Sequence, residues 1–130
     1  MDFDKYQALT GETAIYGDEI NELLGNIDCI AGEEFLEKVR MLLNISYVGL
    51  GLGESGEVQN KIKKIIRDSG GEITDDTRRA IVGELGGQLY YIARVCEHLG
   101  LSMSDVAEDN INILFDRKER GVIKGSGDDR

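Results

Sequence analysis

Two glutamates, Glu54 and Glu57, stand three residues apart in a glycine-rich and otherwise apolar stretch. If this stretch is helical, successive residues turn by about 100° and both carboxylates fall on one stripe of the helix. A third acid, Glu84, belongs to a similar stripe on a later segment. The first stripe contains Tyr47, Leu50, Glu54, Glu57, Val58, Lys61 and Ile65, and the second contains Ala80, Ile81, Glu84, Gln88, Tyr91 and Val95. Their apolar neighbours predict that the three acids face the core.

A carboxylate that leaves water needs a cation, a hydrogen bond or a shifted pKa to compensate the cost. Three inward acids on two helices therefore predict a cation site with hard oxygen ligands. Charged helix residues more commonly lie at the surface of a protein. The alternative is therefore that the three glutamates are solvated acids on helices whose faces are assigned wrongly.

The elements that must position these acids are helices, as the composition indicates. The chain has 130 residues, no proline and 6% aromatic residues, and it is rich in residues that favour helices. This length suits a single domain, residues 1–130, with one core. The apolar spacing predicts a short helix at 3–11, a helix or an irregular segment at 18–31, helical structure at 33–66, and helices at about 75–98 and 103–119.

Local signals set the expected helix ends and breaks. Thr74 or Asp75 can cap one helix, and Ser102 with Asp105 resembles a capping box. The stretch at 33–66 is either one helix or two helices with a break near residues 44–46. Glycines at 49, 51 and 53 would each weaken a helix by about 1 kcal/mol relative to alanine. We therefore expect another backbone to pass close to them.

The charge balance excludes two classes of partner. The chain has 25 acidic and 15 basic residues and a formal net charge of −10, which disfavours binding to nucleic acid or to an anionic membrane. No apolar run approaches the length of a membrane span and the N-terminus is acidic, so we expect neither a span nor a signal peptide. Cys29 and Cys96 have no metal-binding spacing. We expect both to be reduced thiols in a cytoplasmic protein.

Four segments in chain order resemble the MazG-type nucleoside triphosphate pyrophosphohydrolases of the all-alpha NTP pyrophosphatase superfamily. Glu54-Ser-Gly-Glu57 followed by Glu84-Leu-Gly-Gly87 is similar to the ExxE…ExxD signature of that family. Residues 6–16 are similar to its N-terminal segment, and residues 110–130 to the tail of its phage and bacterial members. The resemblance implies an all-α bundle of four or five helices that forms oligomers.

The resemblance also implies an activity and a cofactor. Members of the family use Mg²⁺, for which Mn²⁺ can substitute, to hydrolyse NTPs or dNTPs between the α and β phosphates. Glu54, Glu57 and Glu84 would then be the metal ligands and the catalytic residues. These residue types suit the chemistry, because a metal ion offsets phosphoryl charge and lowers the pKa of a bound water, and phosphoryl transfer depends mainly on positioning and charge stabilisation.

The same resemblance implies substrate contacts. Lys61 is placed to reach a phosphate, Tyr91 to stack on a base, and Asn110 to hold a phosphate or the sugar, while Arg117 and Arg120 on and after the last helix are expected to contact the triphosphate. Asn110 shares its stripe with apolar residues, so we expect its amide to face inwards.

Each of these contacts has an alternative explanation. Lys61 can belong to a solvated face, Tyr91 to the core or a subunit interface, and Asn110 to a local hydrogen bond. The tail at 118–130 is expected to be mobile unless a ligand or a partner subunit orders it.

Two departures from the family pattern bear on turnover. Gly87 stands where the second motif of the family ends in aspartate, and Ile113 stands where its last helix usually has lysine. Gln88 offers only a neutral amide oxygen in place of the missing carboxylate. We therefore expect a weakened metal site, and the alternative function is a nucleotide-binding or regulatory module with little or no turnover. A purely structural helical oligomer is a third possibility.

The expected assembly is a homodimer or a homotetramer. The motif helices are rich in glycine and carry apolar residues on several sides, which suggests that neighbouring chains cover them. The resemblance implies the same kind of assembly.

Overall fold

The computed structural model of the chain describes residues 1–25 and 32–124. These residues form six α-helices and one short 3₁₀ turn, and no β-strand lies among them, which confirms the all-α fold class. The elements are α1 (Phe3–Gly11), α2 (Tyr16–Gly25), α3 (Glu33–Gly51), η1 (Leu52–Glu54), α4 (Ser55–Asp68), α5 (Asp75–Leu99) and α6 (Met103–Glu119).

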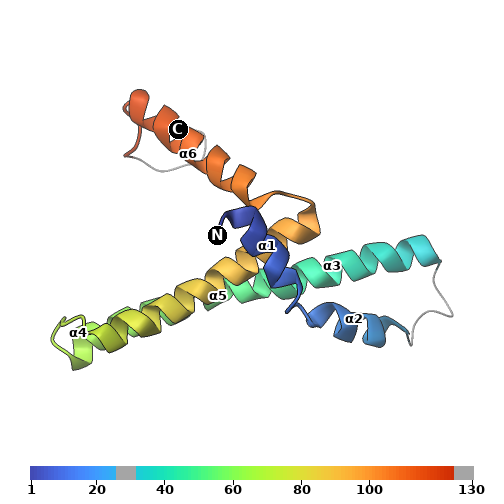
Figure 1. Cartoon of the computed structure of the whole chain (residues 1–130), viewed down its shortest axis with the longest axis horizontal. Helices are drawn as coiled ribbons and strands as arrows, with labels where there is room; N and C mark the ends of the chain where they lie inside the picture. The colour runs from blue at the N-terminus through green and yellow to red at the C-terminus, as the bar shows by residue number, and fades with distance from the viewer. Residues whose placement is uncertain (26–31, 125–130) are drawn as a thin grey trace.

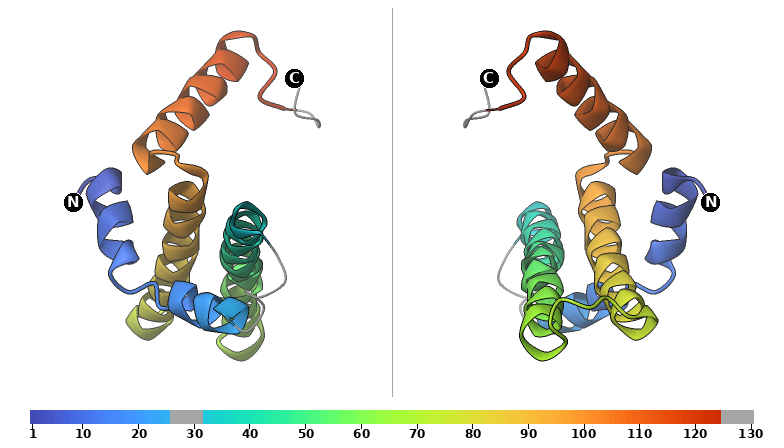
Figure 2. Two further views of the ribbon diagram at one scale, coloured as in Figure 1. Left: turned by 90° about the vertical axis from the view of Figure 1, so that its right-hand side faces the viewer. Right: turned by 90° about the vertical axis from the view of Figure 1, so that its left-hand side faces the viewer.

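Helix α5 is the axis of the molecule. Helices α3 and α4 follow one another along it in the opposite direction, joined by η1, so that they pair with α5 over most of its length (Figure 1). Helix α1 packs against α5, and α2 lies against α3 (Figure 1). Helix α6 projects away from this body, as both views in Figure 2 show. The other helices therefore cover α5 unevenly along its length, and α6 extends outside the bundle.

The helical stretch after residue 33 is divided into two helices, but the break does not lie at residues 44–46. Helix α3 continues through these residues and ends at Gly51, and the 3₁₀ turn η1 follows before α4. Within α3, the Asn44 side chain donates a hydrogen bond to the Arg40 carbonyl one turn earlier, at 3.0 Å. The actual break falls where Gly51 and Gly53 weaken the helix.

Apolar side chains form two small core clusters. One joins α2 to α3 through Tyr16, Ile20, Leu24 and Val48, and the other joins α5 to α6 through Ala93, Cys96 and Met103. Cys96 is a free, buried thiol, as predicted. Cys29 and the rest of the predicted segment at 26–31 lie outside the described residues.

A buried polar group holds α2 against α5. The Tyr16 hydroxyl lies 2.7 Å from His98 Nε2 and accepts a hydrogen bond from Arg94 Nε at 3.2 Å. Tyr16 and Arg94 are both buried, and burial, followed by the positive charge of Arg94, lowers the pKa of His98. His98 therefore has a packing role in this structure.

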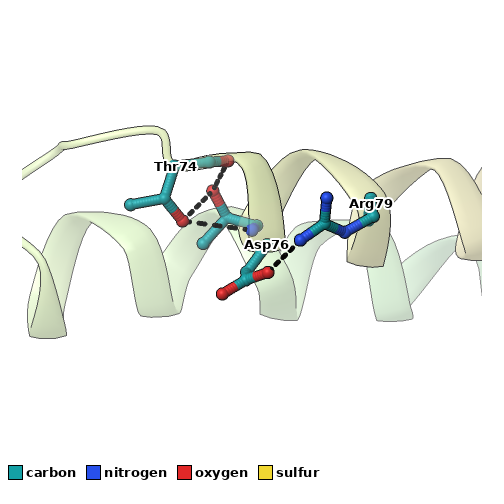
Figure 3. A network of polar contacts seen from close by, with 4 residues as sticks. Thr74, Asp76 and Arg79 are labelled. Atoms are coloured by element: carbon teal, nitrogen blue, oxygen red, sulfur yellow. Dashed lines mark hydrogen bonds and ion pairs between the residues drawn. The ribbon is translucent and has the colours of Figure 1, made fainter.

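The N-terminus of α5 is capped as the sequence predicts. Thr74 is the N-cap residue, and its hydroxyl accepts a hydrogen bond from the Thr77 amide at 3.3 Å while the Thr77 hydroxyl donates to the Thr74 carbonyl at 2.8 Å (Figure 3). Asp76 and Arg79 form an ion pair one turn further on (Figure 3). At the other end Gly100 adopts φ +67°, which favours glycine and ends the helix.

Helix α6 is attached to the body by its first turn. Ser102 caps it by accepting from the Asp105 amide at 3.2 Å, and its hydroxyl donates to Asp4 Oδ1 at 2.8 Å. The Gln7 side chain, which is buried, accepts from the Met103 amide at 2.8 Å. Among the described helices, α6 packs only against α1 and α5.

The C-terminal boundary falls inside the predicted tail. Residues 118 and 119 belong to α6, and the Val122 amide closes its end by donating to the Arg117 carbonyl at 2.9 Å. Residues 125–130 of the tail lie outside the described residues. No helix in the described part of the chain has the length and apolar character that crossing a membrane requires.

Candidate functional site

Two contacts fix how the acidic residues lie across the seam between η1–α4 and α5. Lys61 Nζ lies 3.3 Å from Glu84 Oε1, and Glu54 lines the same pocket as Tyr91. Lys61 is seven residues after Glu54, and Glu84 is seven residues before Tyr91. The two contacts therefore agree on one antiparallel register.

The register also indicates which residue of α5 lies beside each remaining residue of the first motif. Counting from either contact, Glu57 lies at the level of Gln88, beside Gly87. A β-carbon added at Gly87 would meet no atom within 4 Å, so the position has room for a side chain. Glu54 of the first motif and Glu84 of the second thus lie at different levels of the same helix pair.

The predicted burial of the acids was wrong for two of the three. Glu54 and Glu57 are exposed, while Glu84 is partly buried with 28% of its side chain accessible. The reason is that α5 covers only one side of η1 and α4, and no other described helix packs against α4. The stripe itself is correct, because Ile65 further along it is buried and Lys61 faces α5.

A small pocket opens at the η1 end of the seam. It has a volume of about 240 Å³ and is lined by Tyr47, Leu50, Gly51, Glu54 and Tyr91. Burial, followed by the negative charge of Glu54, raises the pKa of the Tyr91 hydroxyl. The Tyr91 ring therefore stays neutral at physiological pH and presents an aromatic surface beside a carboxylate.

The glycine at the end of α3 makes this pocket possible. A β-carbon at Gly51 would overlap the ring of Tyr91, whereas β-carbons at Gly49 and Gly53 would meet nothing within 4 Å. The close approach predicted for this glycine stretch thus occurs at one position of three, and it involves an aromatic ring instead of a backbone. The ring is also held on α5 by Tyr90, whose ring lies edge-to-face at 5.3 Å between centroids.

A second pocket lies at the other end of the seam. It has a volume of about 190 Å³ between α4 and the start of α5, and its lining includes the basic residues Lys61 and Lys64, the acidic residue Asp68 and the hydroxyl-bearing residues Ser69 and Thr77. Lys61 stands between this pocket and Glu84. Carboxylates thus lie in the middle of the seam, with aromatic rings at one end and ammonium groups at the other.

The donor chemistry of the seam fits Mg²⁺ in one respect. Carboxylates are suitable ligands, and Mg²⁺ is commonly held by one or two of them together with waters and substrate phosphates. Within residues 1–25 and 32–124, no three acidic, histidine or cysteine side chains converge as a ready-made metal site. Glu54, Glu57 and Glu84 stay the candidate metal ligands from the sequence, but the described part of the chain does not gather them into a metal site.

A relative of the same length matches the chain from end to end. The gene 37 protein of Mycobacterium phage L5 is 41% identical over 131 residues, which covers all of both chains. The chain belongs to the family of this gene 37 protein. No protein-family model matches it, and no solved structure matches it.

In this gene 37 family member, the predicted residues of α6 lie apart from the seam. Asn110 is exposed, so the prediction of an inward amide was wrong. The reason is that α6 leaves the body after its first turn and has no described contact with α3, η1 or α4. Arg120 forms an ion pair with Asp116 at 2.6 Å on α6 itself. Asn110, Arg117 and Arg120 are therefore not brought together with the acids within one chain.

One pocket residue was not assigned a functional role from the sequence. Tyr47 lines the pocket beside Glu54 and stacks on Tyr16, with ring centroids 5.0 Å apart, but tyrosines at helical spacing are ordinarily core residues. Its place on the same stripe as Glu54 and Leu50 was the signal that could have identified it.

Proposed function

We propose that this protein hydrolyses a nucleoside triphosphate to the monophosphate and pyrophosphate in a Mg²⁺-dependent reaction. The observation that supports this most directly is the antiparallel seam, which aligns the Glu54–Glu57 motif with the Glu84 motif between an aromatic pocket and two lysines. Each kind of group has a counterpart in a metal–nucleotide complex: an aromatic surface suits the base, carboxylates suit the metal, and ammonium groups suit the phosphates.

The side chains of the seam can be assigned roles in this reaction. One water attacks the α-phosphorus, the bond from that phosphorus to the bridging oxygen breaks, and pyrophosphate leaves with the electron pair. The metal, when bound, supplies charge stabilisation and lowers the pKa of a water. Glu54, Glu57 and Glu84 hold the metal, Tyr91 positions the base, and Lys61 contacts the phosphates.

A nucleotide-binding module with little turnover is the second candidate. Two observations favour it over a fast enzyme. Because residue 87 is glycine, α5 has no carboxylate at the level of Glu57. Glu84 is already paired with Lys61. Both features weaken metal binding while leaving the aromatic pocket in place.

We also propose that the protein assembles as a homodimer or a homotetramer. One chain exposes 9548 Å² of surface, compared with roughly 6,800 Å² for a compact monomer of its mass. Large apolar side chains are exposed on several helices, including Leu50 at 79% and Val82 at 66%. A second copy of the chain could cover such exposed apolar side chains, as at sites of protein association.

The experiment that tests the activity is pyrophosphate release from a panel of NTPs and dNTPs at several Mg²⁺ concentrations. We expect slow release that Glu57→Gln abolishes and that Gly87→Asp increases, since the Asp carboxylate would lie at the level of Glu57 in open space. If nucleotide raises the melting temperature but neither the wild-type nor the Gly87→Asp protein releases pyrophosphate, the result supports the binding module instead. Absence of both release and stabilisation would contradict both candidates.

A further inference from the structure

The hairpin formed by α4 and α5 has two unlike sides. Lys64 of α4 and Ala80 of α5 line the same pocket, so both point to one side of the hairpin. Because successive helical residues turn by about 100°, a residue two positions before or after Lys64 points to the opposite side. The same holds on α5 for residues two, five and nine positions after Ala80. Exposed aliphatic side chains occupy all of these positions and form what we call the aliphatic face: Ile62, Ile66, Val82, Leu85 and Leu89.

The side chains of the aliphatic face follow one another along the hairpin. The ion pair between Lys61 and Glu84 fixes the register of the two antiparallel helices. In this register Leu85 lies level with residue 60, next to Ile62. Residues 81–90 include one charged residue, Glu84, and its carboxylate is directed at Lys61 in the seam. The α5 half of the face is therefore uncharged.

One end of the aliphatic row on α5 is already used for packing. Ala93 and Cys96, four and seven residues after Leu89, are buried with Met103 of α6, and Tyr6 of α1 packs against them. The row is bare only along the first half of α5, where α4 lies beside it (Figure 1). Among the described elements, only α5 and η1 pack against α4. A packing surface thus continues beyond the helices that cover it.

Three properties of the face suit a second copy of this chain. The surface of one chain exceeds that of a compact monomer by roughly 2,700 Å², and a standard interface removes about 800 Å² from each partner. A net charge of −10 opposes contact between two copies, but the face itself contributes no carboxylate. Rows of side chains spaced by four residues, such as Ile62 with Ile66 and Leu85 with Leu89, form ridges that fit grooves of the same spacing.

We propose that two copies of this chain associate through the aliphatic faces of their α4–α5 hairpins. The four helices then form two layers, and the side that carries Lys64 and Ala80 faces outward in each copy. Because the same face meets its own copy, the interface closes at two chains. This inference rests on the assembly proposed above, for which it names the surface, and it needs neither a metal nor a nucleotide.

The test is the mass of the full-length chain, measured by sedimentation velocity over a range of concentrations. Ile66→Lys buries one ammonium group from each copy in the interface, so the assembly should fall to half its mass and the dissociation constant should rise roughly a hundredfold. Val82→Lys should do the same from α5. Ile15→Lys is the matched control, because Ile15 lies in the turn between α1 and α2 and is 68% exposed, compared with 67% for Ile66. It should keep the wild-type mass.

The possible outcomes separate the face from the assembly. If the wild-type protein is larger than one chain but Ile66→Lys and Val82→Lys keep its mass, or Ile15→Lys halves it equally, the face is wrong and the assembly stands. If the wild-type protein stays at 14.4 kDa at every concentration, both proposals are wrong. Lys63 and Arg67 border the face beside Ile62 and Ile66, so vesicles of phosphatidylcholine and phosphatidylglycerol are included. A single chain that sediments with them would identify a lipid surface as the occupant and overturn the proposal.

Discussion

The contact between Gly51 and Tyr91 shows how one missing side chain shapes the candidate site. The Tyr91 ring occupies the space that any β-carbon at position 51 would need. Its position in turn sets the wall of the pocket that contains Glu54. A residue without a side chain thus determines where an aromatic ring and a carboxylate meet.

Gly51→Ala should therefore destabilise the fold. The added methyl group forces the ring aside, at a cost of about 1–3 kcal/mol for overpacking, which exceeds the gain of about 1 kcal/mol from the better helix propensity of alanine. Gly49→Ala is the matched control, because that position is exposed and open, so only the gain in propensity remains. Urea denaturation should show opposite signs for the two variants. Equal stabilisation by both would mean that the ring does not pack against Gly51 in solution.

The residue types and spacing of the seam could be predicted from the sequence, but its exposure could not. Helical phase places Glu54, Glu57 and Lys61 on one stripe, and the structure places Glu54 and Lys61 of this stripe beside residues of α5. Whether a stripe is covered depends on how many helices surround it. The sequence carries no signal for that number at η1 and α4, so the acids were expected to be buried.

At the level of elements, Ser102 both caps α6 and links it to α1. Ser102 satisfies the Asp105 amide and at the same time donates to Asp4, which also accepts from the Ser104 amide at 3.1 Å. The Ser102 hydroxyl, followed by the Ser104 amide, lowers the pKa of Asp4. The cap of one helix is therefore also its attachment to another.

Ser102→Ala should loosen α6 as well as shorten it. Loss of an N-cap costs about 0.5–2 kcal/mol, and hydrogen exchange should rise in the first turns of both α1 and α6. Thr74→Ala is the control, since it removes a cap whose side-chain hydrogen bond is to Thr77 on the same helix, α5, and not to α1. Because folding lowers the Asp4 pKa, its contribution is present above its ordinary value of 3.8 and is lost as the pH falls through the folded value. Unchanged hydrogen exchange in α1 would contradict the proposed link between Ser102 and α1.

The helix ends were largely predictable because capping is local. Thr74, Ser102 and Gly100 act at the ends where their side chains or backbone freedom suggest. The break at residues 52–54 could not be located from the sequence, because three spaced glycines spread the weakness over several positions, and the packing of Tyr91 on Gly51 marks the actual end of α3. A contact between distant segments is not visible in a local pattern.

For the whole molecule, the direction of α6 decides which residues can share a site. Asn110 and Arg117 lie beyond the first turn of a helix that projects from the body (Figure 1), and they cannot reach the seam of their own chain. The expected bundle of four or five helices had no such projection. In a symmetric dimer, each protruding helix can pack on the partner, where the excess exposed surface would be covered.

If α6 serves the seam of a neighbouring chain, two inactive chains should restore each other. Asn110→Ala, expected to lower pyrophosphate release, is mixed with Glu57→Gln under conditions that allow subunit exchange. In each mixed dimer one site then combines an intact seam with an intact α6, so a statistical mixture should regain roughly a quarter of wild-type activity. If α6 serves its own chain, every site in the mixture keeps one substitution and activity stays at the level of the separate variants. Light scattering of the wild-type protein should first show a multiple of the 14.4 kDa chain mass.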